Sequence, residues 1–298
     1  MSERIVTSVG DRELSLSNLD KVLYPAAGFT KGEVIAYYAR IAPTLLPHAR
    51  GRCITFRRYP NGVDGTSFFE KRCPKHRPEW VEVAIGPGDR NGTVEYCRLE
   101  EDAAVVWAAN LAALELHAPM ARAADLEAPT MCVFDLDPGE QTGMAECAAV
   151  ALELQELCEG LDLELFPKTS GSKGLQCYLP LNTPHTHEQC ADFALAAGQL
   201  LEKRHPKGVV TGMAKKDRVG KVLIDWSQNA RHKTTICVYS LRARPQPTVS
   251  TPVTWDEVEA AADGAALSFT TDDVLDRVDE LGDLFAPTIT LEQRLPTA

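Results

Sequence analysis

Residues 131–139 read MCVFDLDPG, and this short stretch decides the fold expected for the chain. Its first seven residues, 131–137, form a short apolar run bounded by Pro129 and Pro138, a pattern that predicts a buried strand. On a strand, residues two apart point to the same face of the sheet. Asp135 and Asp137 should therefore project together while Leu136 points into the core.

Helices and strands are expected to alternate along the chain on both sides of this strand. Thr30 is a plausible helix N-cap, with Glu33 three residues later as in a capping box. The predicted helices cover residues 30–46, 103–117, 144–161 and 187–204, and the further strands cover 163–166, 175–179, 221–225 and 234–239. Strand–helix–strand–strand–helix–strand between residues 131 and 239 is typical of a ferredoxin-like sheet flanked by helices. The acidic C-terminal tail should add one or two short helices. We therefore expect an α+β fold.

Composition is ordinary for a soluble globular protein of this size. The 298 residues are 44% hydrophobic and 24% charged. No apolar run approaches the about 20 residues that span a membrane, and the N-terminus lacks the apolar core of a secretory signal. The expected location is cytoplasmic, with no membrane partner. The nine cysteines form no CxxC pair, so we expect reduced thiols in the core.

Charge is unevenly distributed along the chain. The net charge is −11, and residues 253–298 hold eleven acidic and two basic residues, which accounts for −9 of it. Residues 50–77 and 203–233 are instead rich in Lys and Arg. Each basic stretch is either a groove for phosphate groups or a solvated charged surface.

Three acidic residues are candidates for metal binding. Asp135 and Asp137 offer hard oxygen ligands of the kind that Mg²⁺ or Mn²⁺ prefers, and Pro138 ends their strand. Asp225 closes the apolar run VLI at residues 222–224, so it should lie at another strand end. Three carboxylates can complete a two-metal site. The alternative is that they are solvated acids at strand ends.

Residues 169–174, TSGSKG, are a candidate phosphate loop. Small residues let backbone N–H groups approach a phosphate, hydroxyl groups donate hydrogen bonds and Lys173 supplies positive charge. The spacing differs from GxxxxGK[ST], so this is not a Walker A loop. A flexible hairpin turn is the alternative.

Together these elements form an ordered set that resembles the catalytic signature of the archaeo-eukaryotic primase superfamily. More closely, the chain resembles a stand-alone version of the polymerase domain of bacterial nonhomologous end-joining DNA ligases. The resemblance runs from about residue 14 to about residue 255, and the matching stretches are SLSNLDKVLYP, TKGEVIAYYARIAP, RRYPNGVDGTSFFEK, LELHAP, VFDLDPG, TSGSKGL, VLIDWSQN and KTTICVYSLRARP.

The resemblance implies one primase-polymerase catalytic domain over residues 1–298. It would have an N-terminal α/β DNA-binding module (about 1–125) packed on an RRM-like or ferredoxin-like catalytic module (about 126–250), followed by an acidic segment (251–298). It also implies a DNA-dependent DNA/RNA polymerase, a nucleotidyltransferase that extends primers at short gaps or double-strand-break ends in DNA repair. The implied cofactors are two Mn²⁺ or Mg²⁺ ions. The implied nucleotide substrates are NTPs or dNTPs, with a preference for ribonucleotides. The implied DNA is gapped or has a 5′-phosphorylated overhang. A separate DNA ligase and an end-binding protein are implied partners.

Residue roles are carried over from the matching motifs. The resemblance makes His117 part of the active centre, with Asp135, Asp137 and Asp225 as the metal ligands. The nucleotide pocket would comprise Ser170, Lys173, Gln176, Lys233 and Arg242. Asn18, Lys21 and Lys31 match a pocket for a DNA 5′-phosphate. Template contacts would come from Phe68, Phe69, Lys71, Arg57, Arg58 and Arg218. Residues 85–93 replace a loop that helps the family to align broken ends, so the sequence does not predict end bridging.

Two other functions compete with this one. A primase that starts chains de novo would share the same signature, although primases of this superfamily often carry a zinc module and the chain has no such cluster. A DNA-end-binding scaffold without turnover is the non-catalytic alternative. No ligase domain is expected, because the sequence lacks a KxDG adenylation motif.

Gln176 stands where the family usually has histidine, which gives a first testable prediction. Glutamine can donate a hydrogen bond to a phosphate but cannot carry a positive charge. Triphosphate binding should therefore be weaker than in a typical member, and Gln176→His should lower the apparent KM for nucleotide. Steady-state extension kinetics measure this, and an unchanged or higher KM would contradict it.

Overall fold

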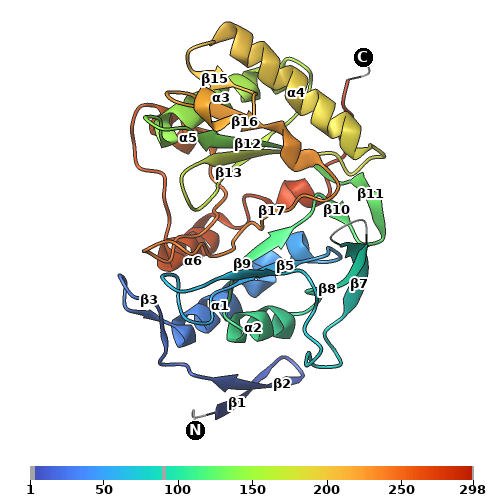
Figure 1. Cartoon of the computed structure of the whole chain (residues 1–298), viewed down its shortest axis with the longest axis vertical. Coiled ribbons are helices and arrows are strands. Elements are labelled where there is room, and N and C mark those ends of the chain that lie inside the picture. The colour runs from blue at the N-terminus through green and yellow to red at the C-terminus, as the bar shows by residue number, and fades with distance from the viewer. Residues whose placement is uncertain (1–3, 89–91, 297–298) are drawn as a thin grey trace. The chain divides into compact units, whose positions relative to one another are not determined.

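Strand β12 (Met131–Pro138) is the middle strand of a five-stranded sheet in the computed structural model, which describes residues 4–88 and 92–296 (Figure 1). The strand order is β13–β14–β12–β16–β15, and every pair is antiparallel except β15 with β16. The other strands of this sheet are β13 (Phe166–Thr169), β14 (Leu175–Pro180), β15 (Val209–Val210) and β16 (Val222–Asp225), and β12 itself pairs with β14 and β16. The expected strand at residues 131–137 is thus confirmed.

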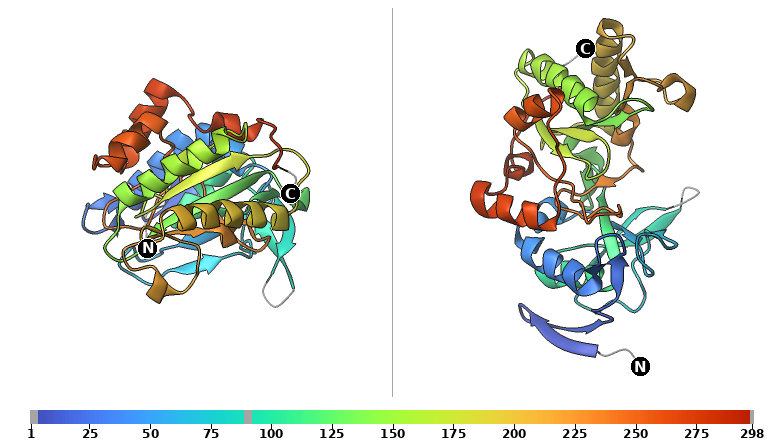
Figure 2. Two further views of the ribbon diagram at one scale, coloured as in Figure 1. Left: turned by 90° about the horizontal axis from the view of Figure 1, so that it is seen from above. Right: turned by 90° about the vertical axis from the view of Figure 1, so that its left-hand side faces the viewer.

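Two long helices, α3 (Met144–Glu159) and α4 (His187–Arg204), pack on this sheet and are drawn in light green and gold in Figure 2. The ring of Phe134 on β12 lies 6.0 Å from that of Phe193 on α4, centroid to centroid. Leu136, two residues on, is fully buried. Because side chains alternate along a strand, Asp135 and Asp137 point to the opposite face.

Without the short edge strand β15, the strand order and the two helices are those of a ferredoxin-like fold, which confirms the α+β prediction. The fourth strand of this arrangement is β16. Residues 234–239, also predicted to be a strand, contribute only the two-residue strand β17 (Thr235–Ile236), which pairs with β9 in a different sheet.

The chain divides into two units. Unit 1 comprises the residues through Pro119, Thr234–Ser250 and Phe269–Glu280, and unit 2 comprises Met120–Lys233, Thr251–Ser268 and the residues from Leu281 onward. The five-stranded sheet belongs to unit 2. Its remaining elements are β10 (Ala121–Arg122), β11 (Asp125–Pro129), α5 (Trp255–Ala262) and three 3₁₀ turns at Lys215–Asp217, Trp226–Asn229 and Ala286–Ile289.

Unit 1 is built on a four-stranded sheet of order β17–β9–β5–β6, with β9 (Ala113–Ala118), β5 (Thr55–Arg58) and β6 (Phe68–Glu70). Helices α1 (Lys31–Ala49) and α2 (Asp102–Asn110) pack on each other, and the Trp107 ring of α2 contacts Phe56 of β5. The other elements are the strand pairs β1 (Arg4–Val9) with β2 (Arg12–Ser17), β3 (Val22–Tyr24) with β4 (Phe29–Thr30), β7 (Val83–Pro87) with β8 (Thr93–Cys97), and helix α6 (Thr271–Leu281).

Helix α1 begins as its sequence predicts. The Thr30 side chain accepts a hydrogen bond from the Glu33 amide, and the Glu33 carboxylate accepts one from the Thr30 amide, so the capping box is confirmed. Two buried tyrosines connect the helix to the rest of unit 1: the Tyr38 hydroxyl donates to Leu114 O at 2.7 Å and the Tyr37 hydroxyl to Tyr239 O at 2.8 Å.

The helix predicted for residues 103–117 is correct only in its first half. Helix α2 ends at Asn110, Ala112 adopts a left-handed φ of 56°, and strand β9 begins at Ala113. Apolar residues run through the whole stretch, so helical periodicity could not locate the break. The alternation of Leu114 and Leu116 with polar neighbours is a strand pattern, and pairing with β5 selects it.

The remaining predictions have mixed outcomes. Cys73 and Cys97 form a disulfide, so the expectation of reduced thiols is wrong for this pair, while the other seven cysteines are buried as expected.

The acidic tail does contain short helices, α5 and α6, and its residues are divided between the two units. Of residues 85–93, the first three belong to β7 and Thr93 begins β8, which pairs with β7, while 89–91 lie outside the described residues. In residues 4–88 and 92–296, no helix is long and apolar enough to cross a membrane.

Gly174 tests how closely the loop before β14 must approach β12. A Cβ at this position would lie 2.2 Å from Leu136 O, a backbone atom that cannot move without disturbing the sheet. Gly174→Ala should lower the free energy of unfolding by about 1–3 kcal/mol through overpacking. The matched control is Gly208→Ala, whose Cβ would lie 4.0 Å from its nearest neighbour. Urea unfolding that shows equal stability for both variants would contradict this.

Candidate active site

Asp135 lies between two polar residues on the neighbouring strands of the unit 2 sheet. In the antiparallel register it pairs with Gln176 of β14 on one side and with Asp225 of β16 on the other. Residues paired directly across antiparallel strands project from the same face. The register therefore brings Asp135, Asp137 and Asp225 to one face of the sheet, opposite the face on which α3 and α4 pack.

The environment of Asp135 disfavours its charged form. Burial raises its pKa, and the negative charge of Asp137 and, less strongly, that of Asp225 raise it further, while a hydrogen bond from Gln176 lowers it. The balance puts the pKa of Asp135 at about 7, instead of the usual 3.8. Mutual repulsion of this kind is relieved when a cation lies among the carboxylates.

Asp225 also caps the 3₁₀ turn that follows it. Its carboxylate accepts hydrogen bonds from the Ser227 amide at 3.0 Å, the Ser227 hydroxyl at 2.6 Å and the Gln228 side chain at 2.9 Å. A cation on Asp225 would compete with these bonds. Among residues 4–88 and 92–296, no three His, Cys, Asp or Glu side chains are gathered in a cluster that could hold a metal ion. The donor set nonetheless fits Mg²⁺ or Mn²⁺ by its chemistry, since it consists of carboxylate oxygens that repel one another.

Gln176 is held by a chain of hydrogen bonds across the same face. Its amide nitrogen donates to Asp135 Oδ1 at 3.0 Å, and its Oε1 accepts from Lys168 Nζ at 2.5 Å. Lys168 is only 1% exposed and lies 5.2 Å from the centroid of the Tyr178 ring. The amide expected to face a phosphate thus faces Asp135, and its contact with the buried Lys168 side chain fixes its orientation.

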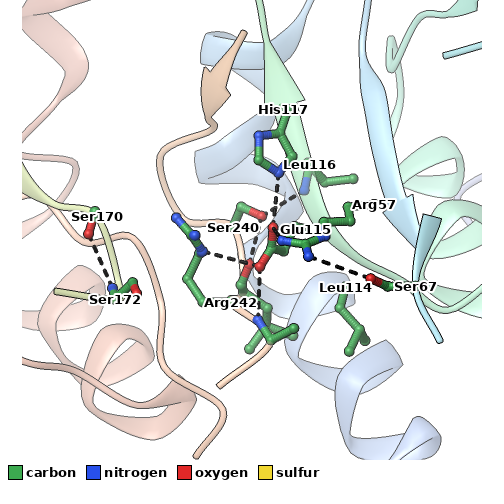
Figure 3. A network of polar contacts seen from close by, with 12 residues as sticks. Arg57, Ser67, Leu114, Glu115, Leu116, His117, Ser170, Ser172, Ser240 and Arg242 are labelled. Atoms are coloured by element: carbon green, nitrogen blue, oxygen red, sulfur yellow. Dashed lines mark hydrogen bonds and ion pairs between the residues drawn. The ribbon is translucent and has the colours of Figure 1, made fainter. Parts of the chain in front are cut away.

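The loop at residues 169–174 is closed by its own serine. Ser170 Oγ accepts hydrogen bonds from the Ser172 amide at 3.2 Å (Figure 3) and from the Gly174 amide at 3.1 Å. The Ser170 amide donates back to Gly174 O, and Gly171 takes a left-handed φ of 66°. The loop therefore has a defined conformation that follows from its small residues, and Lys173 within it is exposed.

In unit 1, Glu115 connects several of the predicted site residues (Figure 3). Its carboxylate lies 3.0 Å from His117 Nε2, 3.2 Å from Arg242 Nε and 3.5 Å from Arg57 Nη1. Burial lowers the pKa of His117 below its usual 6.5, which the carboxylate of Glu115 only partly offsets, so the ring is neutral at pH 7.

The predicted 5′-phosphate residues lie in the first part of unit 1. Lys31 Nζ donates to Ser17 O at 2.6 Å and Asn110 Oδ1 at 2.8 Å, and Lys21 Nζ donates to Pro60 O and to Asn61 Oδ1. Asn18, with φ of 56°, forms the turn that carries Lys21. Burial, together with the nearby charges of Lys21 and Arg58, lowers the pKa of Lys31 to about 8. These cations therefore share a local positive field.

Phe68 and Phe69 on β6 are 43% and 57% exposed, although a large apolar side chain on a sheet would usually be buried. Arg58 lies over the Phe68 ring and Arg57 over the Phe69 ring, and the His117 ring is 5.5 Å from that of Phe69. Exposed aromatic rings supported by arginines are suited to stacking against bases.

Three predicted residues lie in loops. Lys71 follows β6 directly and is half-buried. Arg218 ends the turn after Lys215–Asp217 and donates to Met213 O, and Lys233 is a half-buried residue in the turn after Asn229.

Comparisons with known proteins agree on one family. The model of the family described as "LigD, primase-polymerase domain" matches residues 30–285. The chain belongs to this family. It is 46% identical over 274 residues to the multifunctional non-homologous end joining protein LigD of Mycolicibacterium smegmatis, covering 91% of this chain and 35% of that protein. It is 32% identical over 271 residues to the bifunctional LigD of Bacillus subtilis, covering 91% of this chain and 43% of that protein.

A solved structure agrees with this assignment. The polymerase domain from Mycobacterium tuberculosis Ligase D in complex with DNA superimposes with a TM-score of 0.88 at 42% sequence identity, covering 93% of this chain and 98% of that one. The predicted resemblance to the polymerase domain of end-joining ligases is therefore confirmed. The chain spans less than half the length of these two LigD proteins.

Two residues of this primase-polymerase domain escaped the sequence reasoning. Glu115 lies two residues before His117, so a strand at 113–118 would have placed both on one face, but the stretch was expected to be helical. Lys168 is a charged residue in the strand before the phosphate loop, and its burial depends on contacts with Gln176 and Tyr178 from the next strand.

The pKa of Glu115 predicts how stability depends on pH. Burial alone would raise it, but the hydrogen bond from His117 and the charge of Arg242 prevail and lower it from 4.5 to about 2. A lowered folded-state pKa stabilises the fold above pH 4.5, and this contribution is lost as pH falls toward 2. It amounts to about 3 kcal/mol at most. The free energy of unfolding should fall less steeply below pH 4.5 in Glu115→Gln than in the wild type, as measured by urea unfolding. Parallel curves would contradict this.

Proposed function

We propose that the chain is a metal-dependent, DNA-directed polymerase that extends primers at short gaps or double-strand-break ends. The observation that carries this proposal is the register of the unit 2 sheet, which places Asp135 beside Asp225 on a strand that also carries Asp137. Support comes from the likeness to a polymerase domain that was solved in complex with DNA.

Asp135, Asp137 and Asp225 are the residues that would hold two divalent ions, Mn²⁺ or Mg²⁺. When bound, such ions lower the pKa of an attacking hydroxyl and offset the charge of a triphosphate. Gln176 and Lys168 have a separate role, which is to position Asp135. By holding Asp135 Oδ1 in place, the amide of Gln176 orients one carboxylate of the set.

Cationic side chains and hydrogen-bonding side chains would together hold the nucleotide. We assign Ser170 and Lys173 to its triphosphate, together with Lys233 and Arg242, because cations and a glycine-rich loop suit phosphate groups. Gln176 contributes to the nucleotide site indirectly, by orienting Asp135. His117 is assigned to the active centre, and its neutral ring has one donor nitrogen and one acceptor nitrogen.

DNA contacts are assigned to unit 1 and to one loop of unit 2. Asn18, Lys21 and Lys31 would bind a 5′-phosphate, since two lysines in a shared positive field suit a terminal dianion. Exposed Phe68 and Phe69 would stack on template bases, with phosphate contacts from Arg57, Arg58, Lys71 and Arg218. Complete repair also needs ligation, so a DNA ligase and an end-binding protein are the expected partners.

The decisive experiment is template-dependent extension on a gapped duplex with a 5′-phosphate, using Mn²⁺ and labelled ribonucleotides. Asp135→Ala and Asp137→Ala should each reduce extension on the order of a thousandfold, because several kcal/mol of metal stabilisation are lost. DNA binding, measured by fluorescence anisotropy, should be largely retained. The control is Asp192→Ala, at an exposed position on α4, and this variant should extend primers as the wild type does.

Each outcome decides between the candidate functions. Binding without extension by the wild type would favour a scaffold, and synthesis on an unprimed template would favour a primase. Extension that survives the loss of Asp135 would exclude the proposed site. Removal of the 5′-phosphate from the gap should weaken binding of the wild type, and equal affinity would contradict the role of Lys21 and Lys31.

A further inference from the structure

Glu115 accepts hydrogen bonds or ionic contacts from four groups although its side chain is nearly inaccessible to solvent. Its Oε1 accepts from Arg242 Nε at 3.2 Å and from the Ala243 amide at 3.1 Å. Its Oε2 lies 3.0 Å from His117 Nε2 and 3.5 Å from Arg57 Nη1. The residue is 1% exposed, so its carboxylate is buried; Figure 3 shows the groups that surround it.

The four groups come from three segments of unit 1. Arg57 is on β5, His117 is on β9 with Glu115 itself, and residues 242–243 lie in the segment after β17. That segment is also anchored by Ser240, whose hydroxyl accepts a hydrogen bond from the Leu116 amide at 2.9 Å. Glu115 therefore fixes where the side chain of Arg242 points relative to β9.

The carboxylate also determines the protonation pattern of the histidine. An ionised carboxylate only accepts hydrogen bonds, so Nε2 of His117 must carry the proton. A neutral ring that donates from Nε2 presents Nδ1 as an acceptor. The two oxygens thus perform different tasks, since Oε1 holds the arginine and Oε2 sets the tautomer of the histidine.

We propose that Glu115 is a positioning residue that fixes the orientation of Arg242, an arginine assigned to the nucleotide, and holds His117 as its Nε2–H tautomer. The proposal rests on the function proposed above for Arg242 and His117. In this role Glu115 acts through Arg242 and His117 and not by direct contact with substrate or metal. A purely structural carboxylate would stabilise the unit without affecting either the tautomer or the affinity for nucleotide.

Glu115→Gln separates these roles because it keeps the shape of the side chain. An amide oxygen can still accept from Arg242 and Ala243, but the amide nitrogen must donate to His117, which forces the proton onto Nδ1. The neutral acceptor also holds Arg242 less firmly. We expect the KM for ribonucleotide to rise about tenfold, as for loss of one charged hydrogen bond, with a smaller change in kcat.

The matched control is Glu100→Gln. Glu100 is another carboxylate of unit 1 that contacts two arginines and a backbone amide, through Arg98 Nε at 2.8 Å, Arg50 Nε at 3.9 Å and Gly51 N at 3.0 Å. None of its partners is assigned to nucleotide or DNA. Its KM should stay within about twofold of the wild type.

Nitrogen-15 NMR of the His117 ring gives a readout that does not depend on activity. The wild type should show the Nε2–H tautomer and Glu115→Gln the Nδ1–H tautomer. If Glu115→Gln fails to fold, Glu115→Asp serves instead. The aspartate keeps the negative charge but is too short to reach both His117 and Arg242. We expect it to lose either the Nε2–H tautomer of His117 or the contact with Arg242, and the KM for ribonucleotide to rise.

The outcomes distinguish this proposal from the function beneath it. A wild-type enzyme that extends primers, combined with an unchanged KM and an unchanged tautomer in Glu115→Gln, would overturn the positioning role. So would an equal rise in KM in Glu100→Gln. Lack of extension by the wild type would instead overturn the polymerase proposal, and the tautomer comparison would still decide whether Glu115 sets the state of His117.

Discussion

The hydrogen-bond register of β12 with β14 and β16 is the constraint on which the candidate site depends. Side chains alternate along a strand, so a slip of one residue would turn Asp135 toward α3 and α4 and bring Leu136 to the opposite face. Such a slip would bury a carboxylate among apolar side chains and expose a leucine. The burial of Leu136 and Phe134 under the two helices thus fixes the face on which the carboxylates lie.

The buried charges of the two units have opposite kinds of neighbours. In unit 2, carboxylates of like charge are close to one another, and their repulsion together with burial raises the pKa of Asp135. Such a group of acids is stabilised by a cation. In unit 1, opposite charges meet, because Glu115 lies among two arginines and a histidine and its pKa is lowered. That group needs no further ion, and it holds its members in fixed orientations.

Local sequence signals predicted the elements that have strong local causes. The capping box at Thr30 and Glu33 marks the start of α1, and the periodic stretch at His187–Arg204 is helical over the range expected. The helix predicted through residues 103–117 failed because Ala113–Ala118 becomes a strand only by pairing with β5 and β17. The Cys73–Cys97 disulfide joins residues 24 apart, and only the fold brings those two thiols together.

By itself, the sequence determined the family and the α+β class and predicted three aspartates as metal ligands, since these inferences depend on residue types and on short motifs. The tertiary structure alone decided the partners of those residues. It turned Gln176 toward Asp135, buried Lys168 behind it, and gathered His117, Arg242 and Arg57 around Glu115. Such contacts join strands and segments far apart along the chain, and hydrogen bonding between buried charges depends on geometry that no local pattern encodes.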